Sequence, residues 1–136
     1  MKISTKGRYA LAVMLQLTKI QKPQSGSELS KKLGLSKIYL EQVVTPLRTS
    51  GLINAAKGSA GGYSLTKPAE TITCADILIN AEPALFEVTG ESCLDPQINA
   101  ALNELVYLPL QSSLTVALSN ITLFEIAKTD TDMFYI

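Results

Sequence analysis

The sequence predicts a mainly α-helical fold with one small β-hairpin, and three observations support this fold class. Apolar residues recur at helical spacing in several stretches of the 136-residue chain. A serine, threonine or aspartate precedes most of these stretches at the position of a helix cap. Two short runs, 52–56 and 63–65, flank the glycine-rich stretch 57–62, as the strands of a hairpin do.

The first predicted helix begins near the N-terminus and runs to about Ile20. Ser4 or Thr5 can cap it, because a hydroxyl oxygen accepts a hydrogen bond from a backbone N–H of the first turn. The residues expected on its buried side are Tyr9, Leu11, Ala12, Leu15 and Leu17.

Residues 25–49 predict two helices joined by a short turn. Ser25 and Glu28 fit a capping box at the start of the first helix, and Gly34 suits its end because glycine readily adopts positive φ. Ser36 can cap the second helix. The apolar side of that helix is expected to consist of Leu40, Val43, Val44 and Leu47. This is the helix-turn-helix pattern, whose second helix enters the major groove of DNA with its N-terminal residues toward the base edges.

Pro46 lies inside the second of these helices, where a proline removes a backbone hydrogen bond and clashes with the preceding turn. We expect a kink there, or a new helix start with Thr45 as the cap and Pro46 at the first helical position. Gly51 then ends the helix.

The stretch 52–65 predicts a hairpin that forms a wing beside the two helices. Its turn contains small residues and the single charge of Lys57. A tip with such small side chains can approach a narrow groove closely, so we expect Lys57, Gly58 and Ser59 at phosphates or in the minor groove.

Charge is divided unevenly along the chain, although the net charge is zero. Residues 1–67 hold 11 basic and 2 acidic residues, a net charge of +9, whereas residues 68–136 hold 1 basic and 10 acidic residues, a net charge of −9. A basic half that carries a helix-turn-helix is expected to bind double-stranded DNA. Lys2, Lys6 and Arg8 cluster at the start of the first helix, where cations oppose the helix dipole, so we expect a phosphate near them; a solvated charged face is the alternative.

The acidic half predicts a short helix, an acidic loop and a long helix. Thr73 and Asp76 fit a capping box for the short helix, which Pro83 ends. Asp95 can cap the long helix, and Pro109 is expected to bend or interrupt it.

The long helix carries more aliphatic residues than a small domain can cover. They are Ile98, Leu102, Leu105, Val106, Leu110, Leu114, Ala117, Leu118 and Ile121. We expect this surface to pair with its copy in a two-fold homodimer; a helix folded back onto its own domain is the alternative. The sequence thus predicts a winged helix-turn-helix DNA-binding domain over 1–67, a linker and dimerisation helices over 68–128, and a partner-binding tail over 129–136.

The sequence carries no sign of export or membrane insertion. No apolar run is long enough to span a membrane, and the N-terminus lacks a clear signal-peptide cleavage site. A cytoplasmic location is therefore expected, with Cys74 and Cys93 as free thiols. The chain has no histidine and no phosphate-binding glycine motif before a helix, so we do not expect an enzyme.

Several motifs resemble those of the Rrf-two (Rrf2) family of bacterial winged-helix regulators. The matching residues are 1–10, Leu35–Ser36, Tyr39–Gln42, Pro46–Arg48, Gly51–Leu52, Gly61–Tyr63 and Asn120–Leu123. The resemblance covers nearly the whole chain and is weakest over 84–118. It implies a homodimer whose second helix reads the major groove and whose wing tip enters the minor groove.

The resemblance also implies roles for single residues. Ser36, Tyr39, Glu41 and Gln42 would face bases or phosphates, and Lys57 stands where the family usually has an arginine. Lysine keeps the charge but lacks the planar two-pronged donor, so wing contacts are expected to be less sequence-selective. The full set of expected DNA-binding residues is Lys2, Lys6, Arg8, Ser36, Lys37, Tyr39, Glu41, Gln42, Lys57, Gly58 and Ser59.

Many members of the family hold an iron–sulfur cluster through three cysteines in the loop before the long helix. This loop holds only Cys93, Cys74 lies in the preceding helix, and there is no histidine. A cluster needs about four protein ligands, so we expect no cofactor or metal in one chain; a cluster shared between two chains is the alternative. The acidic neighbours of Cys93 disfavour its thiolate, which makes a redox role the minor interpretation.

The C-terminus follows a short final helical turn that Thr122 begins, and it consists of an acidic spacer and four apolar residues. Met133, Phe134, Tyr135 and Ile136 either pack on their own domain or form a peptide ligand whose carboxylate a partner captures. The branch of the family that represses cysteine-metabolism genes ends in the same four residues. The resemblance therefore implies that cysteine synthase binds this tail, with Ile136 in the enzyme's active site and O-acetylserine competing for it.

These expectations combine into one predicted function. It is a homodimeric, DNA-binding transcriptional repressor of cysteine and sulfur metabolism genes, which lacks an iron–sulfur cluster and is controlled through cysteine synthase. Two alternatives stay open: a protein-interaction adaptor that modulates cysteine synthase, and a redox- or small-molecule-sensing regulator of other genes.

Overall fold

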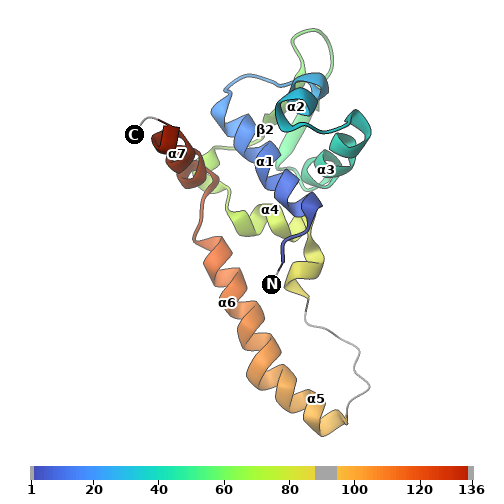
Figure 1. Ribbon diagram of the computed structural model, residues 1–136, viewed down its shortest axis with the longest axis vertical. Coiled ribbons are helices and arrows are strands. Elements are labelled where there is room, and N and C mark those ends of the chain that lie inside the picture. The colour runs from blue at the N-terminus through green and yellow to red at the C-terminus, as the bar shows by residue number, and fades with distance from the viewer. Residues whose placement is uncertain (1, 88–94, 135–136) are drawn as a thin grey trace.

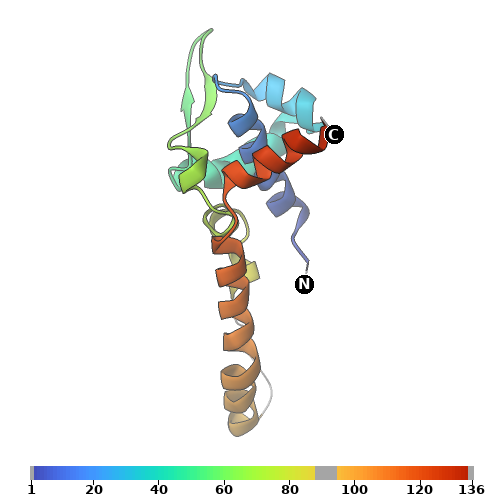
Figure 2. The ribbon, with the colours of Figure 1, turned by 90° about the vertical axis from the view of Figure 1, so that its left-hand side faces the viewer.

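The computed structural model describes residues 2–87 and 95–134, of which 130–134 are described by their backbone alone. The chain forms a body of helices with a two-stranded hairpin, and one long helical rod extends from it (Figure 1 and Figure 2). The predicted fold class, mainly α with a small β-hairpin wing, is confirmed.

Within residues 2–87 and 95–134, nine elements make up the body and three make up the rod. The body contains α1 (Thr5–Lys19), α2 (Gly26–Leu33), α3 (Lys37–Thr49), β1 (Ile53–Ala56), β2 (Gly62–Leu65), the 3₁₀ turn η1 (Ala69–Thr71), α4 (Cys74–Ala81), the 3₁₀ turn η2 (Pro83–Phe86) and α7 (Leu123–Phe134). The rod contains α5 (Pro96–Leu102), the π-helical segment η3 (Asn103–Tyr107) and α6 (Leu108–Ser119).

Side-chain caps start the helices of the body, as predicted. The Oγ atoms of Ser4, Ser25 and Ser36 each accept a hydrogen bond from the backbone N–H three residues further on, at 3.0–3.1 Å. Thr73 and Asp76 form a capping box at α4, with bonds of 3.0 and 3.1 Å in the two directions. Each cap satisfies backbone donors that the first turn of a helix leaves open.

α3 continues through Pro46 to Thr49, so the predicted new start at Thr45 is wrong. The Thr45 hydroxyl instead donates to the Glu41 carbonyl at 2.6 Å. Leu40 and Leu47 lie on opposite sides of Pro46 in the sequence, and both are buried in one core. Packing of that continuous apolar face outweighs the hydrogen bond that proline removes.

The hairpin pairs β1 and β2 antiparallel, from Ile53 opposite Leu65 to Ala56 opposite Gly62. The segment before α2 adds a contact that the sequence did not predict. Gln24 and Tyr63 exchange backbone hydrogen bonds of 2.9 and 2.7 Å, which fasten β2 to the start of α2. Gly62 permits this approach, because it has a φ of 134° and a Cβ there would lie 2.6 Å from the Gln24 carbonyl.

One hydrophobic core joins both halves of the body. Ala10, Val13 and Met14 of α1 meet the buried face of α3, and the same core includes Ile72 and Leu123. The core therefore crosses the predicted domain boundary at residue 67. It also corrects the predicted face of α1: Leu17 is buried, but the other four expected residues are only partly buried. α1 contacts α2, α3, α4 and α7, so its apolar residues are not confined to one stripe that periodicity could identify.

The rod is helical throughout, with η3 just before Pro109. Pro109 was predicted to bend or interrupt this helix, and the π-helical segment is such an interruption, since it changes the hydrogen-bonding pattern where proline has no N–H to donate. No residue of α5, η3 or α6 is buried. α6 contacts α4 and η2 of the body, and from there the rod extends away from the body in both views (Figure 1 and Figure 2).

α7 returns from the rod to the body and is longer than the short final turn that the sequence predicts. Backbone hydrogen bonds from Cys74 N to Ile121 O, 2.9 Å, and from Leu123 N to Ile72 O, 2.8 Å, tie its start to the start of α4. α7 then packs against α1. No helix in the described part of the chain combines the length and the apolar character needed to cross a membrane.

Candidate DNA-binding interface

α3 separates an apolar face from a polar one. Its four predicted core residues are at most 2% exposed, whereas Lys37, Glu41 and Gln42 are exposed. Ser36, just before the helix, is also exposed, although its Oγ is used in the cap. A helix with one face in the core and a polar face in water is able to lie in a groove of DNA.

Tyr39 differs from the other expected contact residues because it is half-buried. Its ring packs edge-on against the ring of Tyr9, with centroids 5.9 Å apart and an interplanar angle of 86°. This geometry is favourable for two aromatic rings. Tyr39 therefore fixes the first turn of α3 on α1, and only part of its surface is available to a ligand.

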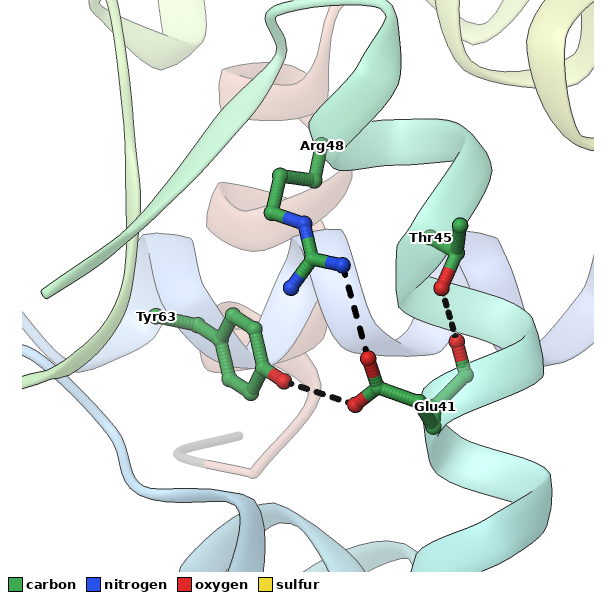
Figure 3. Close-up of polar contacts among 4 residues, drawn as sticks. All are labelled: Glu41, Thr45, Arg48 and Tyr63. Carbon is green, nitrogen blue, oxygen red and sulfur yellow. Dashed lines mark hydrogen bonds and ion pairs between the residues drawn. The ribbon is translucent and has the colours of Figure 1, made fainter. Parts of the chain in front are cut away.

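Glu41 joins α3 to the wing, as Figure 3 shows. One carboxylate oxygen accepts from the Arg48 guanidinium at 3.4 Å, and the other accepts from the Tyr63 hydroxyl at 3.1 Å. Loss of water contact raises the pKa of Tyr63 above its ordinary value of 10.0, and the adjacent Glu41 carboxylate raises it further. Glu41 was expected to face bases or phosphates, but both of its oxygens have partners within the chain.

The wing tip lies at the far end of the hairpin. Lys57, Gly58 and Ser59 are exposed, and Gly61 N donates to Gly58 O at 3.1 Å to close the turn. In the part of the chain that the structure describes, Lys57 forms no ion pair. The expected cation of the wing is thus free to meet a phosphate.

The basic cluster at the start of α1 has a neighbour that the sequence did not reveal. The Glu82 carboxylate accepts the Ser4 backbone N–H with both oxygens, at 2.8 and 3.0 Å. Lys2 and Arg8 are exposed and Lys6 is half-buried. The chain itself therefore places an anion at the helix start, and the contact of Lys2, Lys6 and Arg8 with a phosphate stays a prediction.

Gly7 makes room for Glu82. A Cβ at Gly7 would lie 2.4 Å from Glu82 Oε2. Glycine is unfavourable inside a helix, so its presence in the first turn of α1 is consistent with a close approach by another segment. Its partner was not predictable, because Glu82 is 78 residues away from Ser4.

The sequence contains two cysteines and no histidine. Cys74 is 6% exposed, and burial, followed by the charge of Glu125, raises the pKa of its thiol. Among the described residues, no three cysteine, histidine or acidic side chains lie close enough together to hold a metal ion. Cys93 lies outside the described residues.

The expected partner-binding residues are only partly described. Met133 and Phe134 lie in the last turn of α7 by their backbone, and Tyr135 and Ile136 lie outside the described residues. One exposed residue of α3, Ile38, was not among the expected contact residues.

Comparison with known proteins places these features in a family. Residues 3–129 match the model of the Rrf2 family, described as "Iron-dependent Transcriptional regulator". The chain is 45% identical over 80 residues to the HTH-type transcriptional regulator CymR of Bacillus subtilis, an alignment that covers 57% of this chain and 58% of that protein. It is 32% identical over 131 residues to the regulator IscR of Vibrio campbellii, covering 94% of this chain and 78% of that protein.

Solved structures agree with this assignment. The structure of CymR, "the Global Cysteine Regulator of B. subtilis", has a TM-score of 0.77 and 32% identity, and the match covers 95% of this chain and 98% of that chain. The oxidized form of Staphylococcus aureus CymR has a TM-score of 0.72 and 36% identity, covering 93% and 96%. The chain belongs to the Rrf2 family of winged-helix transcriptional regulators.

Proposed function

We propose that this chain is a homodimeric, DNA-binding transcriptional repressor of cysteine and sulfur metabolism genes. The observation that carries the proposal is the helix-turn-helix with its wing, in which the polar face of α3 and the cation of Lys57 are both exposed. Membership in a family of transcriptional regulators supports it. The chain's alignment with the CymR of B. subtilis spans little more than half of that protein, so the regulator's targets are part of the proposal.

DNA binding is tested by titrating labelled genomic fragments at increasing salt. Phosphate contacts release counterions, so the logarithm of the binding constant should fall linearly with the logarithm of salt concentration, by about 0.9 per phosphate contact. Lys57→Gln should reduce that slope by about 1. Lys128→Gln, on α7, removes the same charge outside the proposed interface and should leave the slope unchanged. A binding constant that does not vary with salt would contradict the proposal.

Dimerisation follows from the uncovered apolar residues of the rod. Leu105 is 74% exposed and Leu110 is 67% exposed, and Ile98, Val106, Leu108 and Val116 are also exposed. So many exposed large apolar side chains on one element are typical of an interface between proteins. A second copy of the rod supplies a matching surface by two-fold symmetry.

The target genes are proposed from the relatives. The two CymR structures share 32% and 36% identity with this chain over nearly their full length. The B. subtilis protein is described as a global cysteine regulator. Sequencing the genomic fragments that the chain retains would test this part, because fragments unrelated to cysteine and sulfur genes would assign the chain other targets.

An iron–sulfur cluster does not fit the donor set of one chain. The sequence offers two cysteines and no histidine, and Cys74 is buried with a raised pKa, whereas a cluster needs about four ligands in thiolate or imidazole form. We therefore propose regulation without a cluster. Anaerobic incubation with iron and sulfide should leave the desalted protein without bound iron.

Control through cysteine synthase is the most specific part of the proposal. Met133 to Ile136 are four consecutive apolar residues that follow an acidic spacer, a composition that suits a short peptide ligand. Removing residues 134–136 should abolish co-purification with cysteine synthase and leave thermal unfolding unchanged. Replacing Thr129 by serine is the matched control. If the shortened chain still retains the enzyme, the tail is not the binding element.

A further inference from the structure

Ile38 is a strongly exposed isoleucine at the start of α3. It is the second residue of the helix and 76% exposed, the largest value among the large apolar residues described. Single apolar side chains are common on protein surfaces, so exposure alone does not indicate a binding role. The position of Ile38 on the helix is the informative part.

Ile38 points away from the core. At 100° per residue, it lies opposite the direction shared by Leu40, Val43, Val44 and Leu47, all of which are buried. Gln42 and Thr45, four and seven residues later, fall on the same outward face and are exposed. Ile38 therefore begins the row of side chains that faces solvent along α3.

Other side chains at this helix end have structural roles. Ser36 caps the helix, and Tyr39 packs on Tyr9. Lys37 and Ile38 are then the exposed side chains of the first turn that are left to reach a ligand. In a helix-turn-helix, the first turn of the second helix meets the base edges.

We propose that Ile38 contacts the C5-methyl group of a thymine in the major groove and thereby selects an A·T base pair at that position. The proposal rests on the DNA binding proposed above. An aliphatic side chain offers no hydrogen bond, so among major-groove groups it fits the thymine methyl and not the polar edges of guanine or cytosine. Gln42, one turn further along the same face, can pair with adenine, so both residues favour A·T sequences.

The test uses deoxyuridine, which differs from thymidine only by the missing methyl group. The full chain first selects duplexes from a random pool, and each thymine of the selected site is then replaced in turn. At one thymine in each half-site, the replacement should weaken binding about fourfold, the effect of losing one buried methyl-sized group. Ile38→Ala should weaken binding to unmodified DNA by a similar factor and should no longer respond to that replacement.

Two further variants serve as controls. Ile38→Val retains the branched methyl groups and should retain the response to deoxyuridine. Ile79→Ala truncates an exposed isoleucine of α4 and should bind as the parent chain does. Ile38 is exposed and alanine favours helix, so the Ile38→Ala variant should fold normally, which circular dichroism checks.

Two results would overturn the inference. If Ile38→Ala binds the selected duplex as tightly as the parent chain, or responds to every replacement as the parent does, Ile38 does not read a methyl group, while DNA binding itself stands. If the chain selects no duplex at all, the proposed function fails and this inference fails with it.

Discussion

The body and the rod are both helical and both rich in aliphatic residues, but only the body buries them. In α3, the four core residues are at most 2% exposed, whereas no residue of α5, η3 or α6 is buried. Both regions show the helical spacing of apolar residues that predicted them. Such spacing therefore identifies a helix and its apolar surface. It does not show whether that surface packs against its own chain or against another one.

The difference has an energetic consequence. A fully buried leucine contributes about 1.5–3 kcal/mol relative to an exposed one. The body gains this contribution within one chain. α6 also contacts α4 and η2, but the most exposed apolar residues of the rod gain this contribution when a second surface covers them, so they should affect association much more than folding.

The largest expected effect comes from a charge in the rod. Leu105→Asp would bring a carboxylate from each subunit into the proposed dimer interface, where unpaired charges cost several kcal/mol. We expect the dimer dissociation constant to rise roughly a thousandfold, about 4 kcal/mol, as measured by sedimentation equilibrium. Gln21→Asp, in an exposed loop of the body, should have no such effect. A variant that remains as dimeric as the parent would remove this residue from the interface.

The next effect contrasts the same truncation in the two regions. Leu47 is fully buried in the body, so Leu47→Ala should lower the free energy of unfolding by about 2–5 kcal/mol in urea titrations. Leu110 is 67% exposed, and Leu110→Ala should change unfolding of the dissociated chain by less than about 0.5 kcal/mol. Equal losses at both positions would mean that the rod is covered within its own chain.

A smaller effect tests the link between Glu82 and the start of α1. Gly7→Ala should displace the Glu82 carboxylate and lower the free energy of unfolding by about 1 kcal/mol, because hydrogen bonds to Ser4 are lost. In a Glu82→Ala chain the same change should cost less than in the parent chain, because the carboxylate is gone and alanine favours helix over glycine, while the new Cβ still lies 3.0 Å from Ile3 Cγ2. Double-mutant analysis by urea denaturation measures this difference. If the effects of Gly7→Ala and Glu82→Ala are additive, the contact with Glu82 is not the reason that Gly7→Ala destabilises the chain.

The smallest expected effect concerns the polar link between α3 and the wing. Tyr63→Phe removes the bond to Glu41 and should cost about 0.5 kcal/mol, since this link is partly solvent-exposed. The raised pKa of Tyr63 means that the fold favours the neutral phenol. The stabilisation that comes from neutral Tyr63 is fully present below about pH 10, the ordinary pKa of tyrosine. It is lost as the pH rises through the raised pKa of Tyr63 in the folded chain. Stability measured from pH 8 to 11 should therefore fall less steeply for Tyr63→Phe than for the parent chain.

The candidate interface was predictable in part. The exposure of Gln42, Lys37 and Lys57 followed from helical spacing and from the small residues of the wing turn. The partners of Glu41 did not, because Tyr63 comes from the other side of the hairpin and is 22 residues away. Ile38 was overlooked because its residue type suggests a core position, although helical spacing places it opposite the four buried residues of α3 and its 76% exposure agrees with that spacing.

By itself, the sequence determined where the main helices of the body start and where the wing turns. A capping side chain, such as that of Ser25 or Ser36, accepts a hydrogen bond from the backbone only three residues away. The local sequence is therefore enough to predict where these helices start. The tertiary structure decided which side of α1 is buried, that α3 continues through Pro46, and that Glu82 meets Ser4. These outcomes depend on atoms from distant segments, and burial and charge act between neighbours in space whatever their separation along the chain.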